Sequence, residues 1–154
     1  GMFRYLTGLL EQQEQGGWEK EMEPFADFAA EILREKPAGK YKRYGDGLYL
    51  LPEEMPETGG LRVLRSGWFL GTLKKGRFEP SQAFAMGLKK EEVRQIVDFP
   101  LEDGRVLRYL KGETVESDTP DGWTLICVDG FPLGWAKAQK GRLKNKYPVS
   151  WKWE

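Results

Sequence analysis

Two turn signals near the C-terminus constrain the fold more than any other feature of the sequence. The apolar run GWTLICV at residues 122–128 has the length of a β-strand and ends in Asp129-Gly130, the strongest short-range signal for a β-hairpin. The segment FPLGWAKA returns from this turn, Lys140-Gly141 forms a second turn, and RLKNKYP follows as a last strand or loop. The last third of the chain is therefore predicted to be a β-sheet.

A helix is predicted at residues 24–36, with Pro24 in its first turn, where a missing N–H group is harmless. Pro37 and Gly39 end it. Its buried face is formed by apolar residues at helical spacing: Phe25, Phe28, Ala29, Ile32 and Leu33. The outer face is acidic, and we expect it to serve as a scaffold or to face a neighbouring domain.

Short strands and two further helices fill the middle of the chain. Residues 41–51 predict a strand, a Gly-Asp-Gly turn and a second strand, and residues 61–80 predict two or three more. The apolar opening at residues 2–18 fits either a strand or a first helical turn. Short helices are expected at residues 80–88 and 102–113, with these residues facing inward: Ala83, Phe84, Gly87, Leu88, Val106, Leu107 and Leu110. The order of elements indicates an α+β fold with a small barrel-like sheet.

Charge is segregated although the net charge of the 154 residues is zero. Residues 11–36 carry eight acids and three bases, whereas residues 131–154 carry six bases and one acid, Glu154. Residues 61–78 hold five bases and no acid. Such asymmetry suggests a polyanionic partner, and a solvated basic surface is the alternative.

Several kinds of chemistry are excluded by the residues that the chain lacks. It has no histidine and one cysteine, so it can form neither a Ser-His nor a Cys-His catalytic pair, and we expect no structural zinc site. Cys127 lies within an apolar strand, where a buried and inert thiol is expected. One cysteine allows no internal disulfide, which fits a reducing cytoplasm. No apolar run reaches the roughly 20 residues of a membrane helix, and nothing resembles a signal peptide.

The basic segment DGFPLGWAKAQKGRLKNKYP is the main candidate site. In a hairpin, Trp135, Lys137 and Gln139 fall on one face, and Ala136 and Ala138 fall on the other. Cations held on a rigid sheet can contact successive phosphates of RNA, and an aromatic ring can stack on an unpaired base. The alternative is a solvated sheet edge on which lysines discourage association between sheets.

The same segment resembles the C-terminal signature of the bacterial Sun-family (Nol/Nop/Sun, RsmF-like) ribosomal RNA cytosine-C5 methyltransferases. The matching residues are Gly130, Pro132, Leu133, Gly134, Lys137, Gly141, Leu143, Lys144, Asn145, Tyr147 and Pro148. GDGLYLLPEEMP, LRVLRSGWFLGTLKKGRFEPSQAFAMGL and VLRYLKGE are similar to the region between the catalytic domain and that tail. The resemblance covers residues 45–148.

The resemblance implies a PUA-like fold, a small β pseudo-barrel with flanking helices, and suggests a strand at residues 96–99. We expect an N-terminal linker and amphipathic helix at residues 1–40, a first β subdomain at 41–78 and a PUA-like RNA-binding domain at 79–154. The catalytic portion of the family, with its S-adenosylmethionine site and two catalytic cysteines, has no counterpart here. The expected chain is therefore a non-catalytic unit without a cofactor of its own.

The implied partners are ribosomal RNA and the adjacent methyltransferase domain, in the cytoplasm and without membrane contact. The expected RNA-binding residues are Lys137, Lys140, Arg142, Lys144, Asn145, Lys146, Tyr147 and Trp135, with Arg65, Lys74, Lys75 and Arg77 extending the surface. For Trp135, a core role is the competing interpretation. The competing function is a docking module in which the same surface packs on the methyltransferase domain or on a ribosomal protein without touching RNA. An independent enzyme has little support.

Overall fold

A computed structural model describes residues 18–53 and 67–153 of the chain. The chain forms two compact units that divide between Phe84 and Ala85. The divisions expected from the sequence, after residues 40 and 78, do not coincide with this one. The apolar opening at residues 2–17 and the segment 61–66, which includes Arg65, lie outside the described residues.

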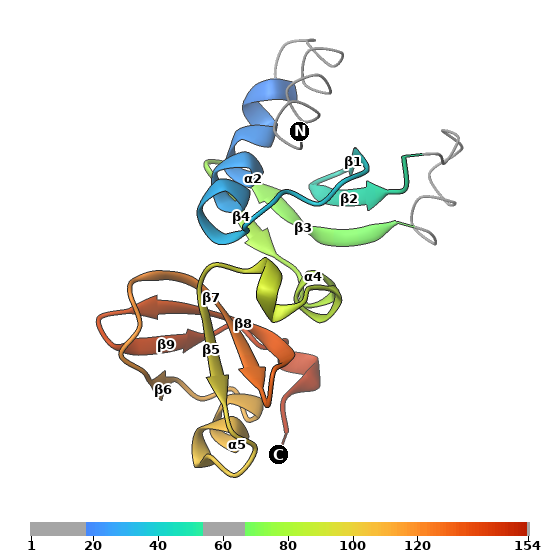
Figure 1. The fold of residues 1–154 in the computed structure, drawn as a ribbon. Helices are drawn as coiled ribbons and strands as arrows, with labels where there is room; N and C mark the ends of the chain where they lie inside the picture. The colour runs from blue at the N-terminus through green and yellow to red at the C-terminus, as the bar shows by residue number, and fades with distance from the viewer. Residues whose placement is uncertain (1–17, 54–66, 154) are drawn as a thin grey trace. The chain divides into compact units, whose positions relative to one another are not determined.

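The first unit begins with helix α2 (Trp18–Ile32), which packs against strands β3 and β4 (Figure 1). All five residues predicted for its inner face are buried. The predicted start was wrong, because the helix begins at Trp18 and Pro24 lies inside it. Met22 and Phe25 are both 0% exposed, so burial on either side of Pro24 compensates for the hydrogen bond that proline cannot make.

A four-stranded antiparallel sheet completes the first unit. Its strands run in the order β1 (Lys40–Tyr44), β2 (Gly47–Leu51), β3 (Trp68–Lys74) and β4 (Arg77–Pro80). The strand–turn–strand prediction for residues 41–51 is confirmed. Aromatic rings of the helix and sheet form the core. The centroid of the Phe25 ring lies 5.4 Å from that of Tyr41 and 5.0 Å from that of Phe78.

Helix α4 (Gln82–Gly87) follows β4, as predicted. Phe84, Ala85 and Leu88 are buried, whereas Ala83 and Gly87 are exposed. Two of the four residues expected on its inner face therefore lie on the exposed side of the helix, and Ala85 is buried instead.

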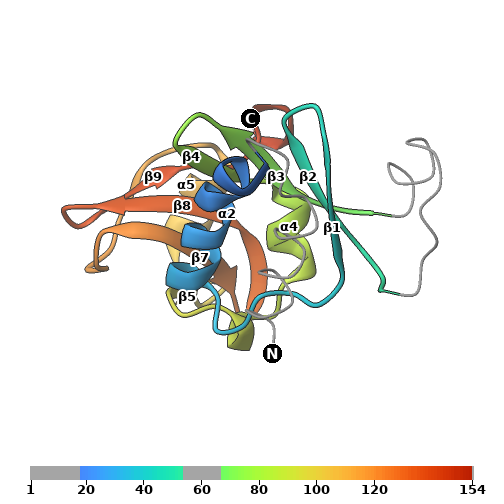
Figure 2. The ribbon, with the colours of Figure 1, turned by 90° about the horizontal axis from the view of Figure 1, so that it is seen from above.

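The second unit contains a five-stranded sheet in the order β5-β7-β8-β9-β6. After the short 3₁₀ helix η1 (Lys90–Glu92), its elements are β5 (Ile96–Phe99), α5 (Gly104–Leu110), β6 (Val115–Glu116), β7 (Gly122–Val128), β8 (Phe131–Gln139), β9 (Arg142–Asn145) and a second 3₁₀ helix, η2 (Val149–Trp151). Strands β7, β8 and β9 are antiparallel neighbours and lie side by side in Figure 2, whereas β5 is parallel to β7. The predicted α+β class, with a strand at residues 96–99, is confirmed.

Helix α5 covers one face of this sheet. Its buried residues Val106, Tyr109 and Leu110 join a core cluster with residues of β7, β8 and β9. Leu107 was expected to face inward but is 46% exposed, and Tyr109 occupies the core instead. The Tyr109 hydroxyl satisfies its hydrogen-bonding capacity there by donating to the carbonyl of Trp135 at 2.8 Å.

Both predicted hairpin turns are present and require left-handed backbone. Asp129 and Gly130 have φ of 46° and 85°, and Lys140 and Gly141 have φ of 49° and 80°. This pair of positive φ values is the signature of the type I′ turn, which matches the twist of the flanking strands. The turns fix the register of the three strands that carry the basic residues.

Among the helices of the described ranges, none is long and apolar enough to cross a membrane.

Candidate nucleic-acid interface

The register of β8 and β9 places the basic residues on one face of the sheet. Lys137 pairs with Lys144, and Gln139 pairs with Arg142. The backbone N–H group of Lys146 donates to the carbonyl of Trp135, which extends the same register one residue beyond the pair Ala136–Asn145. Because side chains alternate between faces, Arg142 and Lys144 of β9 and Lys146 directly after it form a row, with Lys137 beside it. We call these four residues the basic face.

All four side chains of the basic face are exposed. Within the described part of the chain, no carboxylate lies in ion-pair distance of any of them. Glu116 is the register partner of Arg142 on β6, but its carboxylate is paired with Arg108 at 3.2 Å. The positive charge of this face is therefore not compensated by the described neighbours.

The opposite face of the same strands is apolar and packs on α5. Ala136, Ala138 and Leu143 are at most 1% exposed and belong to the core cluster. The predicted alternation of small buried residues with exposed lysines is therefore confirmed. This packing holds the basic face on a rigid sheet.

Lys140 stands apart from the basic face, in the turn between β8 and β9. Its side chain is exposed, and its backbone N–H group donates to the carboxylate of Asp121 at 2.9 Å. Its role in RNA binding stays a prediction.

Trp123 is an aromatic residue of this region that the sequence analysis missed. It is the register partner of Lys137, and the ammonium groups of Lys137 and Lys146 lie 5.6 Å and 5.8 Å from the centroid of its ring. The register between β7 and β8 shifts at Ile126, where Leu133 is an extra residue on β8. A shift of one residue turns a strand's side chains to the other face, so counting from the Asp-Gly turn would have paired Trp123 with Ala136.

Trp135 was among the expected RNA-binding residues, and its position contradicts a stacking role. Its side chain is 1% exposed, and its ring lies 6.4 Å from that of Trp123 in an edge-on arrangement. A base cannot reach a ring that is covered on both faces. Trp135 therefore has the core role that the sequence left as the alternative.

Asn145 is also structural, because its amide is engaged inside the unit. Its NH₂ group donates to the carbonyls of Tyr109 at 2.8 Å and Glu113 at 2.9 Å, and its oxygen accepts from the N–H group of Tyr147 at 2.8 Å. Both amide hydrogens are thus used to join β9 to the end of α5, and neither is available for RNA.

Tyr147 is half-buried between two other aromatic rings. Its centroid lies 5.4 Å from that of Tyr109 and 6.2 Å from that of Trp151, and burial raises the pKa of its hydroxyl. Stacking of Tyr147 on a base stays a prediction.

The three described residues of the first unit that were expected to bind RNA lie around the turn between β3 and β4. Lys74 and Arg77 share the carboxylate of Glu79, at 3.6 Å and 3.3 Å, so their charges are partly compensated. Lys75 is exposed and has no ion pair with another described residue. The role of these three residues in RNA binding stays a prediction.

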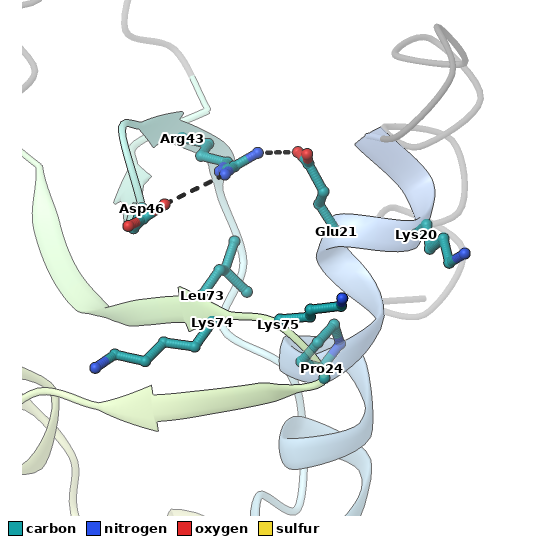
Figure 3. A pocket seen from close by; sticks show the side chains of 9 residues that line it. Lys20, Glu21, Pro24, Arg43, Asp46, Leu73, Lys74 and Lys75 are labelled. Atoms are coloured by element: carbon teal, nitrogen blue, oxygen red, sulfur yellow. Dashed lines mark hydrogen bonds and ion pairs between the residues drawn. The ribbon is translucent and has the colours of Figure 1, made fainter.

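A cavity of about 390 Å³ lies beside this turn, between α2 and the turn that joins β1 to β2. The guanidinium of Arg43 forms ion pairs with both carboxylates of its lining, Glu21 and Asp46 (Figure 3). In Figure 3 the ammonium groups of Lys20 and Lys74 point away from this pair and away from each other. The cations of the lining do not converge, so we do not include the cavity in the candidate interface.

Cys127 is 0% exposed, and burial raises the pKa of its thiol to about 12. The thiolate, which is the reactive form, is therefore absent at neutral pH. The described residues contain no cluster of carboxylate and cysteine side chains that could hold a metal ion.

Two family models match the chain. The model described as the RsmF rRNA methyltransferase first C-terminal domain matches residues 27–88, and the model described as the methyltransferase RsmF PUA domain matches residues 97–153. The chain belongs to the RsmF family. The expected resemblance to this family and the expected PUA-like fold are confirmed.

Curated relatives agree with the RsmF models. The chain is 28% identical over 127 residues to ribosomal RNA small subunit methyltransferase F of Shewanella oneidensis, which covers 80% of this chain and 26% of the relative. It is 30% identical over 107 residues to the protein of the same name from Shewanella loihica, covering 67% of this chain and 21% of the relative. The chain therefore spans about a quarter of the length of these relatives.

The RsmF matches divide the expected RNA-binding residues between two domains. The basic face and Trp123 lie in the RsmF PUA domain, and Lys74, Lys75 and Arg77 lie in the RsmF first C-terminal domain. One matched model describes a C-terminal domain and the other a PUA domain, so the chain is an accessory region of this methyltransferase family.

Proposed function

We propose that this chain is a non-catalytic RNA-binding region of an RsmF-type methyltransferase and that its PUA domain binds ribosomal RNA through the basic face. The observation that carries the proposal is the row of exposed cations at alternate residues from Arg142 on β9 to Lys146 just after it, with Lys137 beside it and no described carboxylate paired to any of them. Lys140 extends this surface at the hairpin turn.

The row suits a phosphate backbone for a physical reason. Residues two apart on a strand are separated by about 6.6–6.8 Å, so successive side chains of β9 can contact different phosphates of one RNA strand. Each neutralised phosphate releases counterions, and this release makes a favourable contribution to the free energy of binding that does not depend on base sequence. The packing of the opposite sheet face on α5 means that little order has to be gained on binding.

The proposed role is to anchor the enzyme on folded ribosomal RNA in the cytoplasm, so that the target cytosine enters an active site elsewhere. S-adenosylmethionine and the two catalytic cysteines belong to the implied methyltransferase domain. The buried Cys127 is no substitute, because its thiol is neither accessible nor ionised. We expect no heat when S-adenosylmethionine is titrated into this chain, and measurable binding would contradict the non-catalytic assignment.

Docking on a protein partner is the competing function, and exposed aromatic residues favour it. Trp151 and Trp153 are 51% and 56% exposed near the C-terminus, and Leu107 is exposed on α5. Exposed apolar groups of this kind are common at interfaces between proteins. The sequence placed docking on the basic surface, whereas these exposed residues lie outside the basic face, so docking through them and RNA binding predict different sensitive residues.

The salt dependence of binding tests the proposal. A transcript of small-subunit ribosomal RNA is bound to the chain in filter assays at increasing salt concentrations. Phosphate binding predicts that log affinity falls linearly with log salt, by about 0.7–0.9 units of slope for each neutralised phosphate. An affinity that stays constant between low and moderate salt would contradict the proposal.

A further inference from the structure

We infer that Trp123 is a positioning residue of the basic face, and that one phosphate group of an RNA strand binds to the ammonium groups of Lys137 and Lys146, which the indole ring holds in place. This inference rests on the proposed function and adds a specific phosphate subsite to it. It also gives a role to an aromatic residue that the sequence pattern did not single out.

The subsite is assembled from three segments of the chain. Trp123 lies on β7, Lys137 lies on β8, and Lys146 follows β9. Both ammonium groups approach the same ring, at 5.6 Å and 5.8 Å from its centroid. The hairpin registers place both lysines near this ring. Lys137 is the register partner of Trp123, and the backbone N–H group of Lys146 is hydrogen-bonded to the carbonyl of Trp135 on β8.

The ring has a physical reason to attract both lysines. The face of an indole carries partial negative charge, and an ammonium group within about 6 Å of its centroid is attracted to it. Two ammonium groups near one ring also repel each other, and the described residues offer neither of them a carboxylate partner. A phosphate between them would relieve this repulsion and accept hydrogen bonds from both.

The indole is itself fixed by the core of the unit. Its ring meets that of Trp135 edge-on, at 6.4 Å and 85°, and Trp135 is 1% exposed. A buried ring therefore supports a half-buried ring, which in turn orients two exposed lysine side chains. Ordering lysine side chains before binding lowers the entropy lost when the ligand arrives.

Replacing Trp123 tests the positioning role. The probes are an unstructured oligouridylate and a transcript of small-subunit ribosomal RNA, each bound over a range of salt concentrations. Trp123→Leu removes the attraction for both lysines, and we expect about a fivefold loss of affinity for either RNA. The slope of log affinity against log salt should become shallower by about 0.7–0.9, the value for one phosphate. Trp123→Phe keeps a ring and should restore most of the affinity and the original slope.

Trp153→Leu is the matched control, because it removes an exposed tryptophan whose backbone N–H group bonds to Leu110 of α5, outside the basic face. It should leave the affinity and the slope unchanged. Equal affinities and slopes for the original chain and for Trp123→Leu would overturn the inference. A loss with Trp123→Leu that Trp123→Phe does not reverse would also overturn it, because the ring would then not be the required feature.

Lysine substitutions test the shared phosphate without altering Trp123, and so stay informative if Trp123→Leu unfolds. If Lys137 and Lys146 bind one phosphate, the double variant Lys137→Gln/Lys146→Gln should reduce the slope by one phosphate, about 0.7–0.9. The losses of affinity in the two single variants should not be additive, since the residues share a partner. Additive losses and a reduction equivalent to two phosphates would overturn the shared subsite while leaving the proposed function intact. Unchanged binding in all lysine variants would contradict the proposed function itself.

Discussion

Lys137 and Lys144 are direct register partners on β8 and β9, and both side chains are exposed. Two like charges directly opposite each other weaken a pair of strands. Within the described residues, neither lysine forms an ion pair with a carboxylate that would offset this repulsion. The arrangement is thus unfavourable for the folded unit alone, and it becomes favourable when an anion lies over both residues.

Replacing Lys144 should therefore stabilise the fold while it weakens RNA binding. We expect Lys144→Gln to raise the free energy of unfolding by about 0.2–1 kcal/mol at low salt. The gain should shrink as salt screens the repulsion. Urea denaturation at two salt concentrations measures this, with Lys140→Gln in the adjacent turn as a control that has no register partner. A less stable Lys144→Gln protein would show that the cross-strand pair is not repulsive.

Trp135 should be important for stability and unimportant as an RNA contact. Trp135→Ala leaves a cavity in a nearly closed site, and we expect it to lower the free energy of unfolding by about 3–5 kcal/mol. Trp153→Ala, at a 56% exposed position, should change it by less than about 0.5 kcal/mol. Trp135→Phe keeps a buried ring, so its folded form should bind RNA as well as the original chain does. Loss of RNA binding by a folded Trp135→Phe protein would instead support a stacking role for Trp135.

Asn145 should also act through stability. Asn145→Ala removes three hydrogen bonds that join β9, α5 and Tyr147, and we expect a loss of about 2–3 kcal/mol in the free energy of unfolding. Asn145→Asp should be at least as harmful, because it places a carboxylate against two carbonyl oxygens. Thermal and urea denaturation measure both losses. Unchanged stability together with weaker RNA binding would contradict this structural role.

The strands and turns of the PUA domain were predictable because their signals are local. The Asp-Gly and Lys-Gly turns set the hairpins, and the alternation of alanine with lysine on β8 separated the buried face from the exposed one. The roles of Trp135 and Asn145 were not predictable in the same way. A tryptophan in line with exposed lysines looks accessible, and only the packed structure shows that its ring is covered.

Trp123 was missed for a different reason. Its position beside Lys137 depends on the bulge at Leu133, which shifts the register by one residue. Pro132 and Gly134 flank the extra residue and are typical of bulges, but they do not by themselves fix the register. Helix α2 shows the same limit, because a proline inside a helix is unfavourable locally and is tolerated here through the burial of Met22 and Phe25. Long-range packing decided each of these features.

Acid should weaken the start of α5 in a predictable range of pH. The Asp103 carboxylate accepts hydrogen bonds from the side chain and backbone of Arg105, and these bonds lower its pKa to about 2. A carboxyl group with a lowered pKa stabilises the fold at pH values above its unfolded pKa, and the stabilisation is lost as the pH falls toward 2. Between pH 5 and pH 2, the melting temperature of the original chain should therefore fall further than that of Asp103→Asn, which keeps a helix cap without the charge. An equal fall in melting temperature for the two proteins over this range of pH would contradict the role assigned to the Asp103 carboxylate.

Charge reversal on β9 tests most directly whether the basic face binds RNA. Lys144→Glu/Lys146→Glu is compared with Lys89→Glu/Lys111→Glu, which reverses two exposed lysines of the second unit that lie on neither β8 nor β9. Filter binding to a small-subunit ribosomal RNA transcript is measured across salt concentrations, and circular dichroism confirms that both variants are folded. We predict that the first variant binds weakly, with a slope shallower by at least one phosphate, about 0.7–0.9, and that the second binds like the original chain. Equal binding by all three proteins would contradict the account and favour docking on a protein partner.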